Sequence, residues 1–379
     1  MPDRGSEAGD GRTRSFWSRL RPTSRAALIF ASSRVVVMVA VSAAAVIGHH
    51  PAGRSYTPWD SSWYLFAART GYPRHLTTAA GRVVPSTHAF FPLFPASVRA
   101  VASVARVSYV VAGVVASTAL GLAAAVVLWL LARHLWGPAA ADRAVACVCF
   151  FPASFVFTIP YAEGAMLALA AGCLFALLRR RWVLAGILAA LATASRPNAL
   201  VLVACCAWAS AVALRRRRDW PSLVAPLLAP AGFAGFMVFL RLRTGRWDTW
   251  LTVERDGWHE RLDPGSTWTK LSFFVHHPFA DVNNTLVVLG VAFIVVAGAV
   301  LIRARPPGIV LVYTLGIVAL ALASQTLGAR PRFVLTAFPL VAVIGARLRT
   351  ISLAPVLALS AALLVWLTVV TTTTLLATP

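Results

Sequence analysis

Residues 107–132 read VSYVVAGVVASTALGLAAAVVLWLLA, a run without a single charged side chain. A helix of about 20 apolar residues is long enough to cross the hydrocarbon core of a bilayer. Arginine stands on either side of the run, at Arg106 and Arg133. The run is therefore predicted to be a membrane-spanning helix with basic ends.

The same pattern recurs along the whole chain of 379 residues. Hydrophobic residues make up 59% of the sequence and charged residues only 13%, a balance that excludes both an ordinary soluble domain and a disordered chain. The sequence predicts an all-α polytopic membrane protein with about eleven spans. The spans are predicted at about 26–47, 107–132, 144–158, 162–178, 182–195, 199–214, 222–242, 285–302, 308–327, 334–346 and 351–376.

Two regions follow from these spans: a basic tail at residues 1–25 and a single transmembrane domain at 26–379. A cleaved signal peptide is an alternative for the first apolar run, with Ala43-Ala44-Ala45 as a cleavage site. The many later spans favour an uncleaved first span. Short spans joined by corners with proline indicate broken or tilted helices that meet at a cavity.

The net charge of +22 could belong to a nucleic-acid-binding protein. The arginines, however, form short clusters between apolar runs, where the positive-inside rule puts them. With a cytoplasmic N-terminus, the short inside loops hold 13 arginines and the short outside corners hold 3. The sequence thus predicts a plasma-membrane protein with its N-terminus in the cytoplasm, its C-terminus outside and no nucleic-acid partner.

Two long loops then face outward, at about 48–106 and 243–284, and both are rich in tryptophan and phenylalanine. They are predicted to hold helices that lie on the membrane. In the second loop, aromatic residues and Glu254 recur at helical spacing, which is typical of an interfacial helix with one aromatic and one charged side. The residues of this pattern are Trp247, Trp250, Leu251, Glu254 and Trp258.

Only two carboxylates, Asp60 and Glu163, lie at the outer ends of predicted spans among apolar and aromatic neighbours. A carboxylate in such a place is expensive and is a candidate for function. Asp60 is a candidate general base whose proton affinity partial desolvation would raise, and Glu163 a candidate partner for a sugar. The alternatives are that Asp60 caps a helix and that Glu163 complements a helix dipole.

Three arginines stand at the outer corners, which the positive-inside rule disfavours: Arg196, Arg330 and Arg332. A guanidinium fork suits a phosphate or phosphodiester group, and the alternative is snorkelling to lipid headgroups. Arg34, inside the first span, receives no role. Neighbouring residues are further candidates for binding the donor phosphate or the substrate: Trp59, Trp63, Tyr64, His88, Tyr161 and Asn198.

No metal centre is predicted, because no His, Cys, Asp or Glu group has the spacing of metal ligands. A structural histidine in an aromatic loop is the alternative for His88. The five cysteines all lie in apolar runs and are small buried hydrophobes. The sequence requires no cofactor and leaves the question of a divalent metal open.

Five blocks together resemble the PIG-V family, the GPI mannosyltransferase 2-like membrane glycosyltransferases. They occur in family order across most of the chain, and WDSSWYLFAARTGY is the most specific of them. The blocks are WDSSWYLFAARTGY (59–72), AFFPLFP (89–95), FPASFVFTIPYAEG (151–164), SRPNAL (195–200) and PRFVLTAFPL (331–340). Trp258 also falls where the family tends to carry a tryptophan. Ala199 departs from the family, which often has glycine there.

The resemblance implies a GT-C helical bundle and an inverting transferase that takes mannose from a polyprenyl- or dolichyl-phosphate carrier. In this family the acidic residue of the first outer loop, matched by Asp60, is the catalytic base. The acidic position after Pro-Tyr maps onto Glu163. The sequence looks like an actinobacterial homologue, so the GPI acceptor does not carry over, and the acceptor is a lipid-linked molecule, a glycan or a protein.

Other readings remain open at this point. A non-catalytic lipid or solute transporter predicts inverted repeats and substrate residues at the bilayer midplane, whereas the candidates here lie at the outer boundary. A transferase of another lipid-phosphate sugar, such as arabinose or glucose, and a protein O-mannosyltransferase cannot be separated by sequence.

Overall fold

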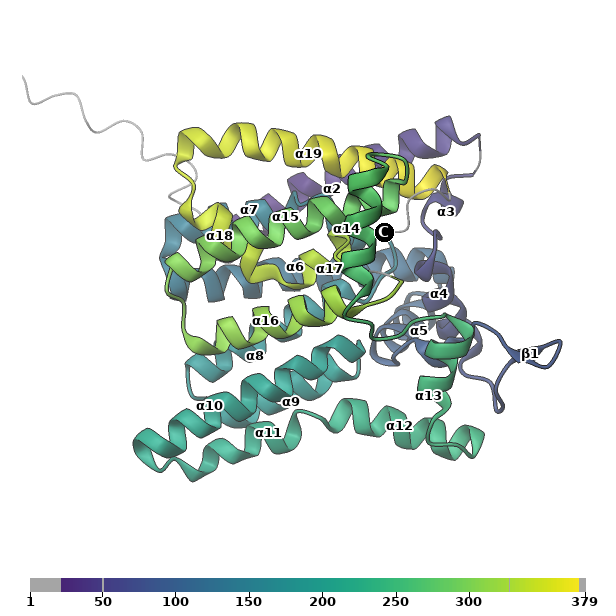
Figure 1. Ribbon diagram of the computed structural model, residues 1–379, viewed down its shortest axis with the longest axis horizontal. Helices are drawn as coiled ribbons and strands as arrows, with labels where there is room; N and C mark the ends of the chain where they lie inside the picture. Colours follow the sequence, from purple (N-terminus) through teal and green to yellow (C-terminus); the bar gives the residue numbers. More distant parts are fainter. Residues whose placement is uncertain (1–21, 50, 327, 375–379) are drawn as a thin grey trace, which may run out of the picture.

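The structure is a computed structural model that describes residues 22–49, 51–326 and 328–374. It is a bundle of helices that run largely side by side (Figure 1), which confirms the all-α class. The one sheet in the described part of the chain is a hairpin of two short strands, β1 (Thr78–Ala79) and β2 (Arg82–Val83). The sequence did not predict this hairpin, which lies in the first long loop.

Six helical segments in the described residues are long and apolar enough to cross a membrane. Five further apolar runs form helices of only 10 to 16 residues. Every predicted span thus contains a helix, but the number that cross the bilayer stays a prediction. The long segments are α2 (Pro22–Ile47), α6 (Tyr109–Trp136), η3 (Pro197–Leu200) with α10 (Val201–Arg217), η4 (Trp220–Leu223) with α11 (Val224–Leu228) and α12 (Ala231–Thr244), α15 (Val282–Arg303) and α19 (Thr350–Thr373). The short ones are α7 (Pro138–Cys149), α8 (Glu163–Leu178), α9 (Trp182–Thr193), α16 (Gly308–Ala323) and α18 (Phe338–Arg347).

α6 and α8 pack closely against each other. A Cβ atom on Gly164 would lie 3.0 Å from the backbone nitrogen of Gly121. Because lipid tails are as apolar as leucine, membrane helices associate through such close backbone contacts at small residues. This crossing fixes the start of α8, where Glu163 stands.

Three helices end early at the same end of the bundle. α7 gives way to η2 (Ser154–Phe157) before α8 begins, α9 ends before Arg196, and α16 ends before α17 (Pro331–Thr336). The charged residues at these breaks are therefore held inside the bundle instead of projecting from its surface.

Arg34 of α2 explains how the first of these breaks is tolerated. Its guanidinium donates to the carbonyl oxygens of Cys149 at 2.9 Å and Ser154 at 2.6 Å, and it is 5% exposed. Backbone groups freed by a helix break inside a membrane need partners within the protein. Arg34 supplies them, a role that the sequence analysis did not assign.

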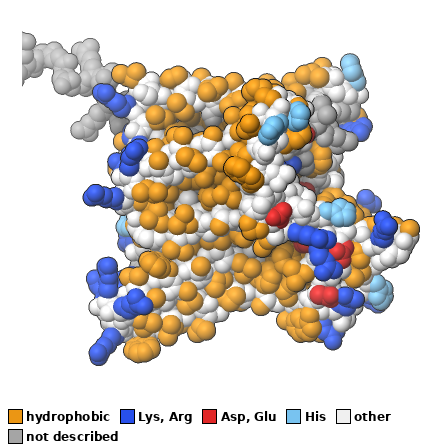
Figure 2. All heavy atoms as spheres, in the orientation of Figure 1, with side chains coloured by type: hydrophobic (Ala, Val, Ile, Leu, Met, Phe, Trp, Pro, Cys, Tyr) orange, Lys and Arg blue, Asp and Glu red, His pale blue; other side chains and the backbone are white. Residues whose placement is uncertain are grey.

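The two long loops lie together at one end of the bundle, at the right in Figure 1. Figure 2 shows hydrophobic side chains over the middle of the molecule, Lys and Arg along the opposite edge, and the visible acidic side chains at the loop end. An apolar band between two polar ends is what a bilayer requires. The first loop holds α3 (Ala52–Ser55), α4 (Asp60–Thr70), η1 (Thr87–Ala89) and α5 (Leu93–Ala105), and the second holds α13 (Thr249–Thr252), the π-helical turn η5 (Val253–Gly257) and α14 (Ser266–His276).

Candidate active site

Asp60 is the first residue of α4, as the sequence predicted. Its carboxylate Oδ2 accepts a hydrogen bond from Nη1 of Arg332 at 2.6 Å, and the side chain is 28% exposed. No side-chain hydrogen bond caps the start of α4, so the capping alternative finds no support. The preceding residue, Trp59, has φ +50°, a conformation that costs energy and that clusters at functional sites.

Glu163, the first residue of α8, is fully buried. Its Oε1 lies 3.4 Å from Nε of Arg332 and also forms an ion pair with Nη1 of Arg196. The four side chains therefore form a chain of alternating charge from Asp60 through Arg332 and Glu163 to Arg196. We call it the charged chain.

Aromatic rings hold the two guanidinium groups in place. That of Arg332 lies over the rings of Tyr161 at 5.1 Å and Phe333 at 4.9 Å, and that of Arg196 lies 5.8 Å from the centroid of the Phe333 ring. The hydroxyl of Tyr161 donates to the carbonyl oxygen of Pro58 at 3.4 Å. Tyr161 thus supports Arg332 and ties the segment before Asp60 to the bundle.

Several buried polar atoms around the charged chain have no hydrogen-bond partner within the described residues. Buried polar groups are normally satisfied, so a group of unsatisfied ones needs an explanation. Two indole N–H groups are donors, the Arg196 Nε–H is another, and two oxygens are acceptors, a set that fits a polyhydroxylated ligand. The atoms are Trp59 Nε1, Trp258 Nε1, Arg196 Nε, Glu163 Oε2 and Asn198 Oδ1.

Two of the aromatic candidates for substrate contact belong to the packing instead. The buried ring of Tyr64 meets Phe90 edge-on at 4.8 Å. Trp63 stacks on the same Phe90 at 6.1 Å and meets Trp258 edge-on at 5.2 Å. Tyr64 therefore packs in the core, its contact with substrate stays a prediction, and Trp63 borders the site through Trp258.

His88 does not reach the charged chain either. Its side chain is fully buried, with Nδ1 3.0 Å from the Ser86 hydroxyl and Nε2 3.1 Å from the Pro73 carbonyl oxygen. A carbonyl oxygen can only accept, so Nε2 carries the proton and Nδ1 accepts from the serine. Burial lowers the pKa of His88. Both ring nitrogens are already bound, which favours the structural alternative.

Arg330 lies beside Arg332 but has different partners. Its Nη2 donates to the Thr326 carbonyl oxygen at 3.2 Å, and the carboxylates of Asp281 and Glu260 act on its charge. Burial lowers the pKa of Arg330 to about 10. The structure therefore joins only two of the three predicted arginines, Arg196 and Arg332, to Glu163.

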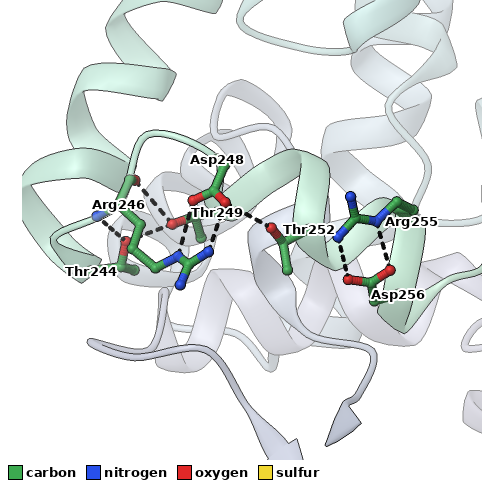
Figure 3. Close-up of polar contacts among 7 residues, drawn as sticks. All are labelled: Thr244, Arg246, Asp248, Thr249, Thr252, Arg255 and Asp256. Carbon is green, nitrogen blue, oxygen red and sulfur yellow. Dashed lines mark hydrogen bonds and ion pairs between the residues drawn. The ribbon is translucent and has the colours of Figure 1, made fainter.

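The carboxylates of the second outer loop lie in two kinds of environment. Arg246 binds Asp248 through two hydrogen bonds of 3.0 and 2.7 Å, and Arg255 binds Asp256 through two of 2.7 Å (Figure 3). The neighbouring guanidinium lowers the pKa of each aspartate. These pairs of residues close together in the sequence shape the loop.

Glu254, predicted above only as part of an interfacial helix, lies near the charged chain. It accepts a hydrogen bond from Trp250 Nε1 at 3.1 Å. Burial and then the charge of Glu260 raise the pKa of Glu254 to about 8, and the charges of Asp60 and Arg196 also act on it. The prediction of separate aromatic and charged sides is wrong here, because Trp250 and Glu254, four residues apart, share the inward side. The spacing of four residues between Trp250 and Glu254 is the feature of the sequence that indicates this contact.

No three His, Cys, Asp or Glu side chains of the described residues are grouped closely enough to hold a metal ion. Asp60 and Glu163 are instead bridged by a guanidinium. The charged chain can thus provide a partly exposed carboxylate, fixed positive charge and unpaired donors and acceptors in one place.

Comparison with known proteins gives the fold. No protein-family model matches the sequence, and no curated protein matches it significantly. The chain is similar to the crystal structure of ArnT from Cupriavidus metallidurans bound to undecaprenyl phosphate, with a TM-score of 0.54 and 16% identity over 86% of this chain and 61% of that one. The Archaeoglobus fulgidus oligosaccharyltransferase in the apo form is a weaker match, with a TM-score of 0.44 and 14% identity over 92% of this chain and 56% of that one. The chain thus spans less than two thirds of either protein, and its fold is that of the GT-C membrane glycosyltransferases.

Proposed function

We propose that this chain is an inverting membrane glycosyltransferase that transfers mannose from a polyprenyl-phosphate donor on the extracytoplasmic side of the membrane. The observation that carries the proposal is the charged chain, in which Asp60 is partly exposed while Glu163 is fully buried between Arg332 and Arg196. The donor class agrees with ArnT, whose structure holds undecaprenyl phosphate. Mannose rests on the resemblance of five sequence blocks to the PIG-V family.

In this mechanism Asp60 is the general base. It takes the proton of the acceptor hydroxyl while that oxygen attacks the anomeric carbon of the donor sugar. The bond between the anomeric carbon and the phosphate oxygen breaks on the opposite face, and the electron pair leaves with the phosphate. Attack opposite the leaving group inverts the anomeric centre. The N-terminal position in α4 fixes the carboxylate relative to the bundle.

Arg332 has two tasks in this scheme. It holds Asp60 through Nη1, and it stabilises the phosphate that gains charge as it leaves. A phosphate that accepts hydrogen bonds from the Arg332 guanidinium weakens the bond between Arg332 and Asp60. The Asp60 carboxylate then becomes a stronger base. The base would therefore become active only when the donor is in place. Glu163, bound to both arginines, keeps them oriented.

The test is an assay of membranes with labelled polyprenyl-phosphate mannose, with identification of the labelled product. Asp60→Asn should fold and lose transfer by about 10²-fold or more, because an amide cannot accept the proton. Asparagine keeps the size of the side chain, so the purified variant should elute as a single species, as the parent protein does. An active Asp60→Asn protein would refute the assignment of the base.

Glu163→Gln is the companion variant. It removes the negative charge between two buried arginines, so its main effect should be on stability, where a broken buried ion pair costs about 3 to 5 kcal/mol. An inactive but fully stable Glu163→Gln protein beside an active Asp60→Asn protein would make Glu163 the base. If the product takes up label from an arabinose or glucose carrier and none from the mannose carrier, the donor sugar is not mannose. The protein would still be a glycosyltransferase.

A further inference from the structure

A second site candidate lies away from the charged chain. A cavity of about 650 Å³ opens between α4, α5 and α12, a volume within the usual range for small-molecule sites. It borders the C-terminal end of α4, at Thr70 and Gly71, whereas Asp60 is at the N-terminal end. At 1.5 Å per residue the two ends of this helix are about 15 Å apart.

Two arginines converge on the mouth of this cavity. Arg99 Nε donates to the carbonyl oxygen of Ala68 at 2.7 Å, and Arg243 Nε donates to that of Tyr72 at 3.0 Å. Both are thus fixed to one turn of chain, and Nη2 of Arg99 lies 3.8 Å from the position of a Cβ on Gly71. Within the described residues neither arginine forms an ion pair with a carboxylate. The terminal amino groups of both can therefore donate to an anion.

The walls of the cavity are apolar. Tyr72, Phe236 and Phe239 form an aromatic side, with the two phenylalanine rings stacked at 6.2 Å. Small residues such as Ala96 and Gly235 also line the cavity, and no carboxylate does. The space therefore has two fixed positive charges at its mouth and apolar surface behind them.

From this arrangement we infer a binding site for an anionic membrane lipid, with its phosphate between Arg99 and Arg243 and an acyl chain along α12. Charge complementarity favours a phosphate group, since the guanidinium groups of Arg99 and Arg243 both line the cavity and no carboxylate there neutralises them. The apolar walls select a lipid over a free anion. The surface of α12 near the cavity continues with exposed Val238, Phe239 and Leu242, so a lipid reaches the cavity directly from the bilayer. The site does not depend on the proposed transferase activity.

Native mass spectrometry of the full chain in detergent, with phosphatidylglycerol or phosphatidylcholine added, tests the inference. The parent protein should retain one phosphatidylglycerol that phosphatidylcholine does not displace. Arg99→Gln and Arg243→Gln should each weaken retention by about tenfold, since each removes charge-assisted hydrogen bonds to the phosphate. Arg69→Gln is the matched control, an exposed arginine of α4 that does not line the cavity.

A second variant tests the acyl-chain half of the site. A Cβ on Gly235 would meet no atom within 4 Å, so a side chain can start from this position, and Gly235→Leu should occupy the cavity and abolish retention. Gly298→Leu is its control, because the same open space surrounds Gly298 on α15. Equal retention by the parent and both arginine variants would overturn the inference. So would displacement of phosphatidylglycerol by inorganic phosphate, which would mean a free-anion site.

Discussion

Arg332 joins two carboxylates that come from distant parts of the chain. It donates through Nη1 to Asp60, 272 residues away, while its Nε faces Glu163. A guanidinium can serve two acceptors in fixed directions because its donors form a rigid planar fork. The ammonium group of lysine is a point charge on a flexible chain and cannot reproduce this geometry.

Arg332→Lys should therefore keep the charge and raise the donor concentration needed for half-maximal transfer by about tenfold, the equivalent of about 1.4 kcal/mol. The dependence of the rate on donor concentration measures this. Arg69→Lys, on the exposed side of α4, should leave it unchanged. If Arg332→Lys shows the donor dependence of the parent protein, Arg332 does not bind the donor phosphate.

Glu254 makes folding stability depend on pH. Burial raises its pKa from the ordinary value of 4.5 to about 8, so the folded protein holds this proton more tightly than the unfolded chain does. The stabilisation is complete below about pH 4.5 and is lost as pH rises to about 8. The melting temperature should fall across this interval, and Glu254→Gln should flatten the fall because glutamine does not titrate.

Asp256→Asn is the control for this experiment. Asp256 is two residues away, and Arg255 lowers its pKa, so its substitution should leave the slope between pH 5 and pH 8 unaltered. An identical slope in the parent and Glu254→Gln proteins would show that Glu254 is ionised throughout.

At the scale of single residues, the sequence identified Asp60 and Glu163 because carboxylates are rare among the apolar runs. It could not show that Arg332 lies between them, since this pairing brings together α4, α8 and α17. It also assigned Tyr64 and His88 to the substrate. Their neighbours in the sequence are polar or aromatic, but in the fold Tyr64 packs against Phe90 in the core and His88 binds Ser86 and the Pro73 carbonyl oxygen of its own loop.

Among the elements, the break between α7 and α8 depends on Arg34. This side chain binds the carbonyl oxygens of Cys149 and Ser154 from another helix. Arg34→Met keeps an unbranched side chain but removes both hydrogen bonds, although the Ser154 hydroxyl still donates to the Cys149 oxygen. The loss of a partner for a buried group costs about 1 to 3 kcal/mol. We expect a lower unfolding temperature in detergent for Arg34→Met. Arg217→Met, an exposed residue at the end of α10, should unfold like the parent protein.

An equal unfolding temperature for Arg34→Met and Arg217→Met would show that water or other backbone groups satisfy the break.

The long helices were predictable from apolar runs alone, as for α6 and α15. The division of residues 144–158 into α7 and η2 was not, because it depends on Arg34 reaching across from α2.

Across the whole molecule, polar groups gather at two ends. Arginine clusters occupy one edge of the apolar band, and the two long loops occupy the other, where acidic side chains lie among further Lys and Arg (Figures 1 and 2). The positive-inside rule predicts that the arginine edge faces the cytoplasm. Reporter fusions after His75, in the first long loop, and after Arg217, in an arginine cluster, should therefore report opposite sides of the membrane. A common side for both fusions would contradict this topology and the extracytoplasmic location of the site.

The short helices bear on how the protein enters the membrane during synthesis. α9 has 12 residues and α18 has 10, so neither reaches across about 30 Å of hydrocarbon at 1.5 Å per residue. A translocon that tests one segment at a time should not release either helix into the lipid on its own. We expect α8 and α9 to partition together as a hairpin beside α6, which makes biogenesis of the end that holds the charged chain dependent on helices synthesised earlier. Truncated chains that end after α9 should integrate both helices when α6 is present and lose them when α6 is replaced by a polar segment.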